Sequence, residues 1–168
     1  MSTLKVDTLQ DKAGAFEHAR LVQVVSTETG TVATGTTTMP LDNTIPQNDE
    51  GDQVMSRTIT PTHASNKLVI EVHVIMSCGT SGRNLEAALF KDSDAGALAS
   101  TYSYAHQGGE PHSNSFSHFM TTGGTSEITF KVRIGTSSGG TVTFNGHGGS
   151  QAHGGVLSSS ITISEIRV

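Results

Sequence analysis

The sequence predicts an all-β protein, and three observations carry this prediction. Apolar and polar residues alternate with a period of two wherever a pattern exists, the alternating runs are rich in Thr, Val and Ile, and short Gly-rich breaks separate them. The best helix candidate, residues 84–91, is too short and fits a strand equally well. The expected fold is therefore an antiparallel two-sheet jelly-roll sandwich.

About eight to ten strands are expected from the alternating runs and the turn-forming residues between them. In chain order the runs cover residues 21–25, 36–41, 54–60, 67–76, 84–90, 113–121, 127–134, 141–145 and 157–168.

The clearest runs also predict which side chains form the core. Residues 67–76 have one fully apolar face and one mixed face, whereas residues 127–134 alternate cleanly between apolar and polar. Such alternation is typical of a sheet with one face on the core and one in water. The predicted core consists of Leu68, Ile70, Val72, Val74, Ile128, Phe130, Val132, Ile134, Ile161 and Ile163.

Composition limits the classes of function. The chain has 168 residues, enough for one compact domain and a short extra segment, and only 34% of them are apolar. With so lean a core, part of the stability is expected to come from partners. The net charge of −5 without a basic cluster disfavours nucleic-acid binding. No apolar run approaches the roughly 18 residues of a membrane span, and the single Cys78 is interpreted as a small core or strand-end residue.

Residues 1–20 differ from the rest, being polar with a thin apolar stripe of Leu4, Val6 and Leu9. We therefore divide the chain into an arm, 1–20, and a jelly-roll domain, 21–168. The alternation suits an extended arm that adds a strand to another chain, with the three apolar side chains as its docking contacts. A loosely ordered terminus fits the composition equally well.

Three runs carry a family resemblance: residues 2–11 (STLKVDTLQD), 59–70 (ITPTHASNKLVI) and 160–166 (SITISEI). Together they resemble tailed-bacteriophage virion appendage proteins of the tail-fibre or head-spike type, with a C-terminal tumour-necrosis-factor-like jelly-roll module. The resemblance implies a homotrimer, made in the host cytoplasm and located in the virion, whose arm attaches to capsid or tail proteins. It implies a capsid spike, decoration protein or short fibre.

An alternative role is a fibre tip that recognises a host-surface receptor through residues 106–112 or 146–155. We expect no enzyme, because no Gly-x-Ser-x-Gly elbow is present and no serine has a defensible partner set. A polysaccharide depolymerase is the least favoured alternative, and it would depend on acids such as Glu71, Glu86 or Asp92.

Lean strands with mixed faces often complete their burial against a neighbouring subunit. Candidate intersubunit contacts are Met39, Tyr102, Tyr104, Phe116 and Phe119. The chain has eight histidines, which raises the possibility of a metal on a three-fold axis, with His118 as the best candidate. Loop or interface histidines without a ligand are the favoured interpretation, so neither a metal nor a cofactor is expected.

Overall fold

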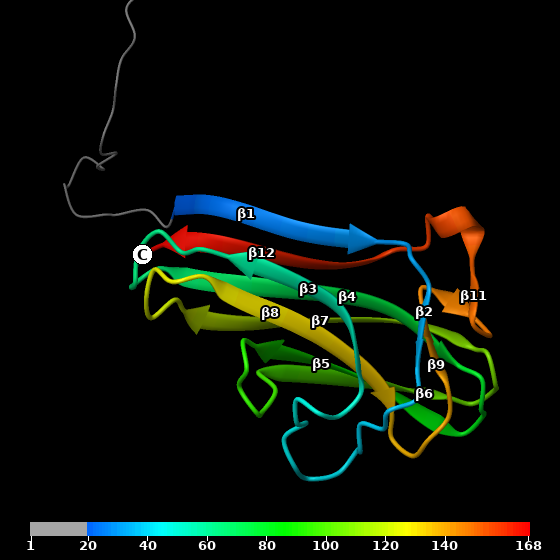
Figure 1. Ribbon diagram of the computed structural model, residues 1–168. Coiled ribbons are helices and arrows are strands. Elements are labelled where there is room, and N and C mark those ends of the chain that lie inside the picture. The colour runs from blue at the N-terminus through cyan, green and yellow to red at the C-terminus, as the bar shows by residue number, and fades with distance from the viewer. Residues whose placement is uncertain (1–19) are drawn as a thin grey trace, which may run out of the picture.

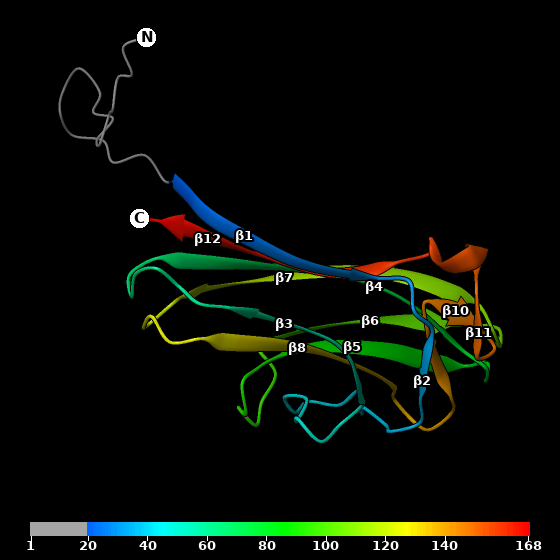
Figure 2. The same ribbon diagram turned by 45° about the horizontal axis from the view of Figure 1, so that its top comes forward.

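The computed structural model describes residues 20–168, which fold into two antiparallel sheets stacked as layers (Figures 1 and 2). The only helical element in this part of the chain is a single 3-10 turn, η1 (His153–Gly155), and no helix there is long and apolar enough to cross a membrane. The strands are β1 (Arg20–Thr29), β2 (Ala33–Gly35), β3 (Asp52–Ile59), β4 (Lys67–Cys78), β5 (Arg83–Lys91), β6 (Ala99–Ala105), β7 (Pro111–Thr121), β8 (Ile128–Thr136), β9 (Val142–Phe144), β10 (Gly146–His147), β11 (Ser150–Gln151) and β12 (Ser159–Arg167).

The first sheet is built around β4. One edge of β4 pairs with β7 along most of its length, and the other edge pairs first with β12 and then with β9. Strand β1 extends the sheet beyond β12, and β2 extends it beyond β9. The second sheet has the order β3-β8-β5-β6, and β10 and β11 form a separate small hairpin. The predicted all-β, two-sheet jelly roll is confirmed.

The core lies between the two sheets, where the alternation placed it. All ten residues predicted for the core are buried, and Ile128 is the most exposed of them at 6%. They form one continuous cluster with apolar side chains from the other strands, such as Leu85, Leu89 and Phe144. Cys78 belongs to the same cluster and is fully buried, as expected of a small core residue.

The segment that follows β2 is not the strand predicted over residues 36–41. It crosses the outer face of the second sheet, and only Thr38 forms an isolated bridge, with Thr136. Met39 donates its backbone N–H to the Thr136 carbonyl at 3.0 Å, and Pro40, which follows, has no N–H for a further ladder bond. Gly135 permits the close crossing, since a Cβ there would lie 2.9 Å from the Thr37 carbonyl oxygen.

Strand β6 was not predicted. Its sequence, residues 99–105, has small or polar side chains on both faces except for two tyrosines, so it lacks the apolar alternation that marks a strand. It becomes a strand because β5 offers it a free edge, to which it pairs from Ala99 to Ala105.

Candidate interaction surface

The solvent-facing side of β1, β12, β4 and β7, here called the outer face, carries an exposed apolar row. The strand registers place Val24, Ser164, Val69 and Phe119 side by side across the four strands. Phe119 is 69% exposed and Val24 is 50% exposed, while Val69 is half-buried. An open sheet face with a large unpacked aromatic ring is typical of a contact surface.

Next to this row lies a shallow polar depression of about 520 Å³. Glu71 and His73 of β4 lie at its centre, and hydroxyl side chains of the two neighbouring strands surround them. The His73 ring Nδ1 shares a hydrogen bond of 3.0 Å with Ser115 Oγ. The hydroxyl side chains that line the depression are Ser115, Ser117, Ser160 and Thr162.

A second exposed aromatic group lies on β6, the edge strand of the other sheet. Tyr102 and Tyr104 point outward from alternate positions and are 57% and 46% exposed. The Tyr104 ring meets the His106 ring edge to face, with centroids 4.8 Å apart. The described chain thus presents aromatic side chains on two separate surfaces.

The five predicted intersubunit residues therefore fall into two groups. Tyr102, Tyr104 and Phe119 are exposed, and their contact role stays a prediction. Phe116 is on the inward side of β7 and is only partly buried against the core. Met39 is 1% exposed and packs on Ala88 and Phe90 of its own chain, so its side chain belongs to the subunit interior. Met39 is buried because residues 36–51 cross the second sheet, a feature that alternation along the sequence does not reveal.

His118 does not lie on an open surface either. It alternates with Phe119 on β7, faces inward and lies beside Ile70 of β4. Burial lowers the pKa of His118 below its ordinary value. Within residues 20–168, no group of three or more His, Cys, Asp or Glu side chains is arranged to hold a metal ion.

The acidic residues considered for sugar cleavage are not brought together. Glu71 is on the outer face, whereas Glu86 is on the far side of the second sheet. The neighbouring residues in the two strands, Val72 and Leu85, both face the core, so the two acids point away from each other. Asp92 is in the turn after β5, where its carboxylate accepts the Thr129 N–H at 2.8 Å. Glu86 is 5% exposed, and burial raises its pKa to about 7.

Two of the three sequence runs that carried the resemblance meet in one hydrogen-bonded cluster. The buried Glu165 carboxylate accepts bonds from the Thr62 N–H (2.8 Å), the Thr62 hydroxyl (2.9 Å) and Asn66 Nδ2 (2.5 Å), and also from Gln23 Nε2. Burial alone would raise the pKa of Glu165, but these hydrogen bonds together lower it. The cluster fixes the turn between β3 and β4 against β12, so these runs have a structural role here.

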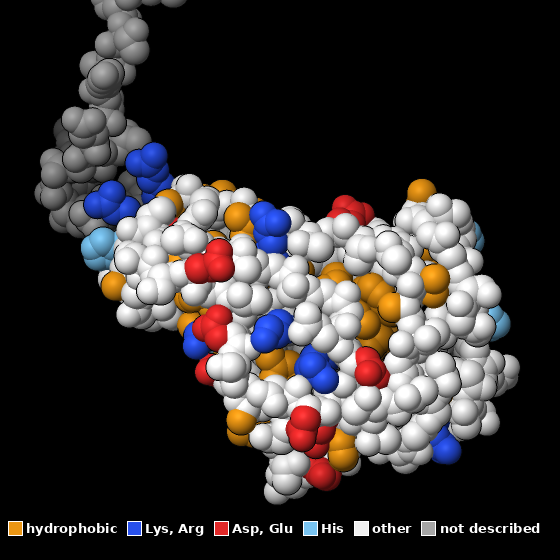
Figure 3. Space-filling view, viewed as in Figure 1, with side chains coloured by type: hydrophobic (Ala, Val, Ile, Leu, Met, Phe, Trp, Pro, Cys, Tyr) orange, Lys and Arg blue, Asp and Glu red, His pale blue; other side chains and the backbone are white. Residues whose placement is uncertain are grey.

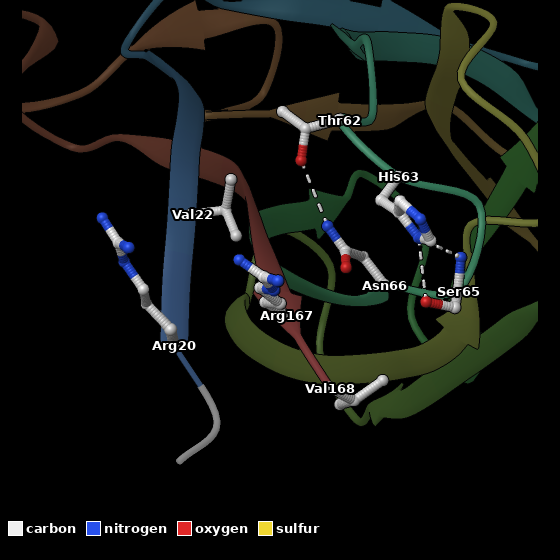
Figure 4. Close-up of a pocket in the computed structure, with 8 residues that line it drawn as sticks. All are labelled: Arg20, Val22, Thr62, His63, Ser65, Asn66, Arg167 and Val168. Atoms are coloured by element: carbon white, nitrogen blue, oxygen red, sulfur yellow. Dashed lines mark hydrogen bonds between the residues drawn. The ribbon is translucent and has the colours of Figure 1, made fainter. Parts of the chain in front are cut away.

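A pocket of about 440 Å³ opens above this cluster, at the end of the sandwich where β1 begins and β12 ends (Figure 4). Arg20 and Arg167, which are directly paired across β1 and β12, flank it, and His63 and Ser65 close the side formed by the β3–β4 turn. Its lining residues are Arg20, Val22, Thr62, His63, Ser65, Asn66, Arg167 and Val168. The three docking residues predicted in the arm, Leu4, Val6 and Leu9, lie outside the described residues.

The opposite end of the sandwich is formed by the glycine-rich connections. The loops around residues 106–112 and 146–155 touch there, since a Cβ on Gly109 would overlap His147 Nε2. Over the face seen in Figure 3, acidic and basic side chains are interspersed among polar surface. That face shows no broad patch of one charge.

Comparison with solved structures gives distant likenesses. The sugar-binding EclA C-terminal domain has a TM-score of 0.39 at 15% identity, over 83% of this chain and 86% of that one. Dimeric latent PorU from Porphyromonas gingivalis has a TM-score of 0.41 at 11% identity, over 94% and 14%. The VP2 subviral particle of infectious bursal disease virus has a TM-score of 0.36 at 14% identity, and the match covers 98% of this chain and 42% of that one. At these TM-scores none of the likenesses bears on what this chain does.

No curated protein matches the sequence, but one family model does, over residues 31–168. That model describes the Pgp3 C-terminal domain, a trimeric jelly roll of the tumour-necrosis-factor-like kind. The predicted tumour-necrosis-factor-like module is supported, whereas the assignment to bacteriophage appendage proteins is wrong, because the matching family is not a phage tail-fibre family. The predicted virion location and phage partners rested on that assignment and have no support here. The chain belongs to the Pgp3 C-terminal domain family.

Proposed function

We propose that this chain is a non-enzymatic β-sandwich module whose activity is to assemble into a homotrimer. The observation that carries the proposal is the exposed apolar row on the outer face, with Phe119 at its end. This face carries an exposed phenylalanine among valines and small hydroxyl side chains. Covering the phenylalanine with a second chain removes apolar surface from water, which favours association. The trimeric state of the family's namesake domain supports a count of three.

A closed three-fold ring needs two different surfaces on every copy, because its contacts are heterologous. The outer face and the β6 edge with Tyr102 and Tyr104 are two such surfaces. In the proposed assembly, the tyrosines of one copy pack on the Phe119 row of the next. Tyrosine suits such a place, since its ring supplies apolar area and its hydroxyl can bond to the serines and threonines beside the row.

The arrangement of acids supports the non-enzymatic part of the proposal. Glycoside cleavage needs two carboxyl groups held across one cleft, whereas Glu71 and Glu86 are on opposite faces of the molecule. Of the two depressions described above, one is shallow and contains Glu71 as its only acid, and the other, at the end of the sandwich, is lined by no acid.

The test is the solution mass of the full chain and of Phe119→Asp, measured by light scattering after gel filtration. The full chain is expected at three times its 17.5 kDa and the variant at the monomer mass. Val156→Asp is the matched control, because Val156 is 83% exposed but lies beside η1, away from both surfaces. A monomeric parent chain, or a control that dissociates as readily as the Phe119 variant, would refute the proposed assembly.

A mixing experiment distinguishes the face-to-edge contact from a symmetric one. A Tyr102→Asp, Tyr104→Asp double variant keeps an intact outer face, and the Phe119 variant keeps an intact β6 edge. When the two variants are mixed, one complete contact is restored, so a heterodimer should form from two monomers. If the mixture stays monomeric although the parent chain is a trimer, the two surfaces do not contact each other.

A further inference from the structure

The pocket at the end of the sandwich brings two arginines together. Arg20 and Arg167 are directly paired across β1 and β12, and both line the pocket of about 440 Å³ (Figure 4). Like charges that lie directly opposite each other on neighbouring strands repel. An anion bound between the two guanidinium groups would relieve this repulsion.

The described residues supply no counter-charge to these arginines. The ion pairs within residues 20–168 involve only Lys91 and His112 as the basic partners, and no acidic side chain lines the pocket. Glu165 lies beneath the pocket, but its carboxylate is taken up by hydrogen bonds from Thr62 and Asn66. The pocket therefore presents positive charge without a balancing acid.

His63 adds a hydrogen-bond donor to the wall of the pocket. The Ser65 backbone N–H donates to His63 Nδ1 at 3.3 Å, and the Ser65 hydroxyl lies 2.9 Å from the same nitrogen (Figure 4). Because Nδ1 accepts the backbone N–H, the proton of the neutral ring is on Nε2. His63 Nε2 can thus donate to an oxygen of a ligand, as the guanidinium groups can.

Asn66 adds a hydrogen-bond acceptor to the same pocket. Its side chain is 2% exposed, and Nδ2 donates to Thr62 Oγ1 and to Glu165. Oδ1, which Figure 4 shows turned away from Thr62, is buried without a partner among the described residues. A buried oxygen of this kind is costly unless a water or a ligand group donates to it. The pocket thus suits a ligand that has a hydroxyl group as well as a negative charge.

We propose that this pocket binds an acidic sugar, a monosaccharide unit with one carboxylate or phosphate group. The planar forks of Arg20 and Arg167 suit both anions, and the sugar hydroxyls face Ser65 and Asn66. The volume is in the range of small-molecule sites, and a bare ion would fill little of it. All lining residues come from one chain, so the site does not require the proposed trimer.

The test is calorimetric titration of the full chain with glucuronic acid and with glucose 6-phosphate. Glucose and sodium phosphate are the reference ligands, and at least one acidic sugar is expected to bind at least tenfold more tightly than either reference. Arg20→Gln and Arg167→Gln should each weaken this binding at least tenfold. Lys67→Gln is the matched control, because it removes the same charge from the outer face, where Lys67 donates to Thr121 Oγ1 at 2.6 Å, and it should change the Kd less than threefold. Thermal unfolding verifies that each variant is folded.

The outcomes separate the site from a general effect of charge and from the assembly. No binding of either acidic sugar, or undiminished binding in an Arg20→Gln, Arg167→Gln double variant, overturns the site. Phosphate that binds as tightly as both acidic sugars would indicate an adventitious ion only and would overturn the sugar assignment. Phe119→Asp should bind the acidic sugar as the parent chain does, whatever the mass of the two proteins, and loss of binding in this variant would contradict a site built by one chain.

Discussion

At the scale of single residues, the buried acids show how the surroundings decide what one side chain does. Glu165 and Glu86 are both buried, yet Glu165 is held ionised by hydrogen bonds, with its pKa lowered, whereas the Glu86 pKa is raised to about 7. The difference follows from donors. Glu165 meets Thr62, Asn66 and Gln23, whereas one carboxyl oxygen of Glu86, Oε1, is buried without a partner.

Glu86 makes stability depend on pH. Its folded pKa of about 7 is above the usual 4.5, so between these values the folded chain binds a proton that the unfolded chain has lost. The contribution of the protonated Glu86 to the free energy of unfolding is complete below about pH 4.5 and is lost as pH rises through 7. The loss is at most about 3 kcal/mol. Urea unfolding at pH 5 and pH 8 should show the loss in the parent chain and a smaller change in Glu86→Gln. An equal loss of unfolding free energy between pH 5 and pH 8 in the two proteins would assign the pH dependence to other groups.

At the scale of elements, the segment that crosses the second sheet depends on one glycine. A Cβ on Gly135 would lie 2.9 Å from the Thr37 carbonyl and 3.0 Å from the Met39 Cβ, so any side chain there pushes the segment away. Gly135→Ala is expected to lower the free energy of unfolding by about 1–3 kcal/mol. Gly124→Ala, where a Cβ meets nothing within 4 Å, should change it by less than about 0.5 kcal/mol. Chemical denaturation measures both, and similar losses would mean that the crossing segment can shift without cost.

At the scale of the whole molecule, the proposed assembly predicts a stability that depends on protein concentration. Only 34% of its residues are apolar, and Phe119, the most exposed aromatic side chain within residues 20–168, is on the proposed contact surface. Because association stabilises the folded state by mass action, Tm should rise with protein concentration in the parent chain. Calorimetry over a hundredfold range of concentration checks this, and Phe119→Asp should unfold at one temperature throughout. A constant Tm in the parent chain would argue against coupled folding and assembly.

The sequence by itself determined the strands with strong alternation and the side chains on the core face of each. Both follow from the two-residue periodicity along a single strand, and the ten predicted core residues are all buried. It did not find β6, because an edge strand of small and polar residues has no apolar alternation. Its short motifs also misled on family, since the two that lie within the described residues supply side chains to the cluster at Glu165, which is a feature of the fold.

Only the tertiary structure decided what each surface carries. Met39 is buried because its own segment crosses the second sheet and packs on Ala88 and Phe90, and Phe116 and His118 face inward while Phe119 faces outward. The same packing put Glu71 beside His73 in a hydroxyl-lined depression, and Glu86 on the far face. These outcomes depend on which segments meet across the sandwich. Periodicity along one strand cannot specify them, because it gives the two faces of a strand but not what covers each face.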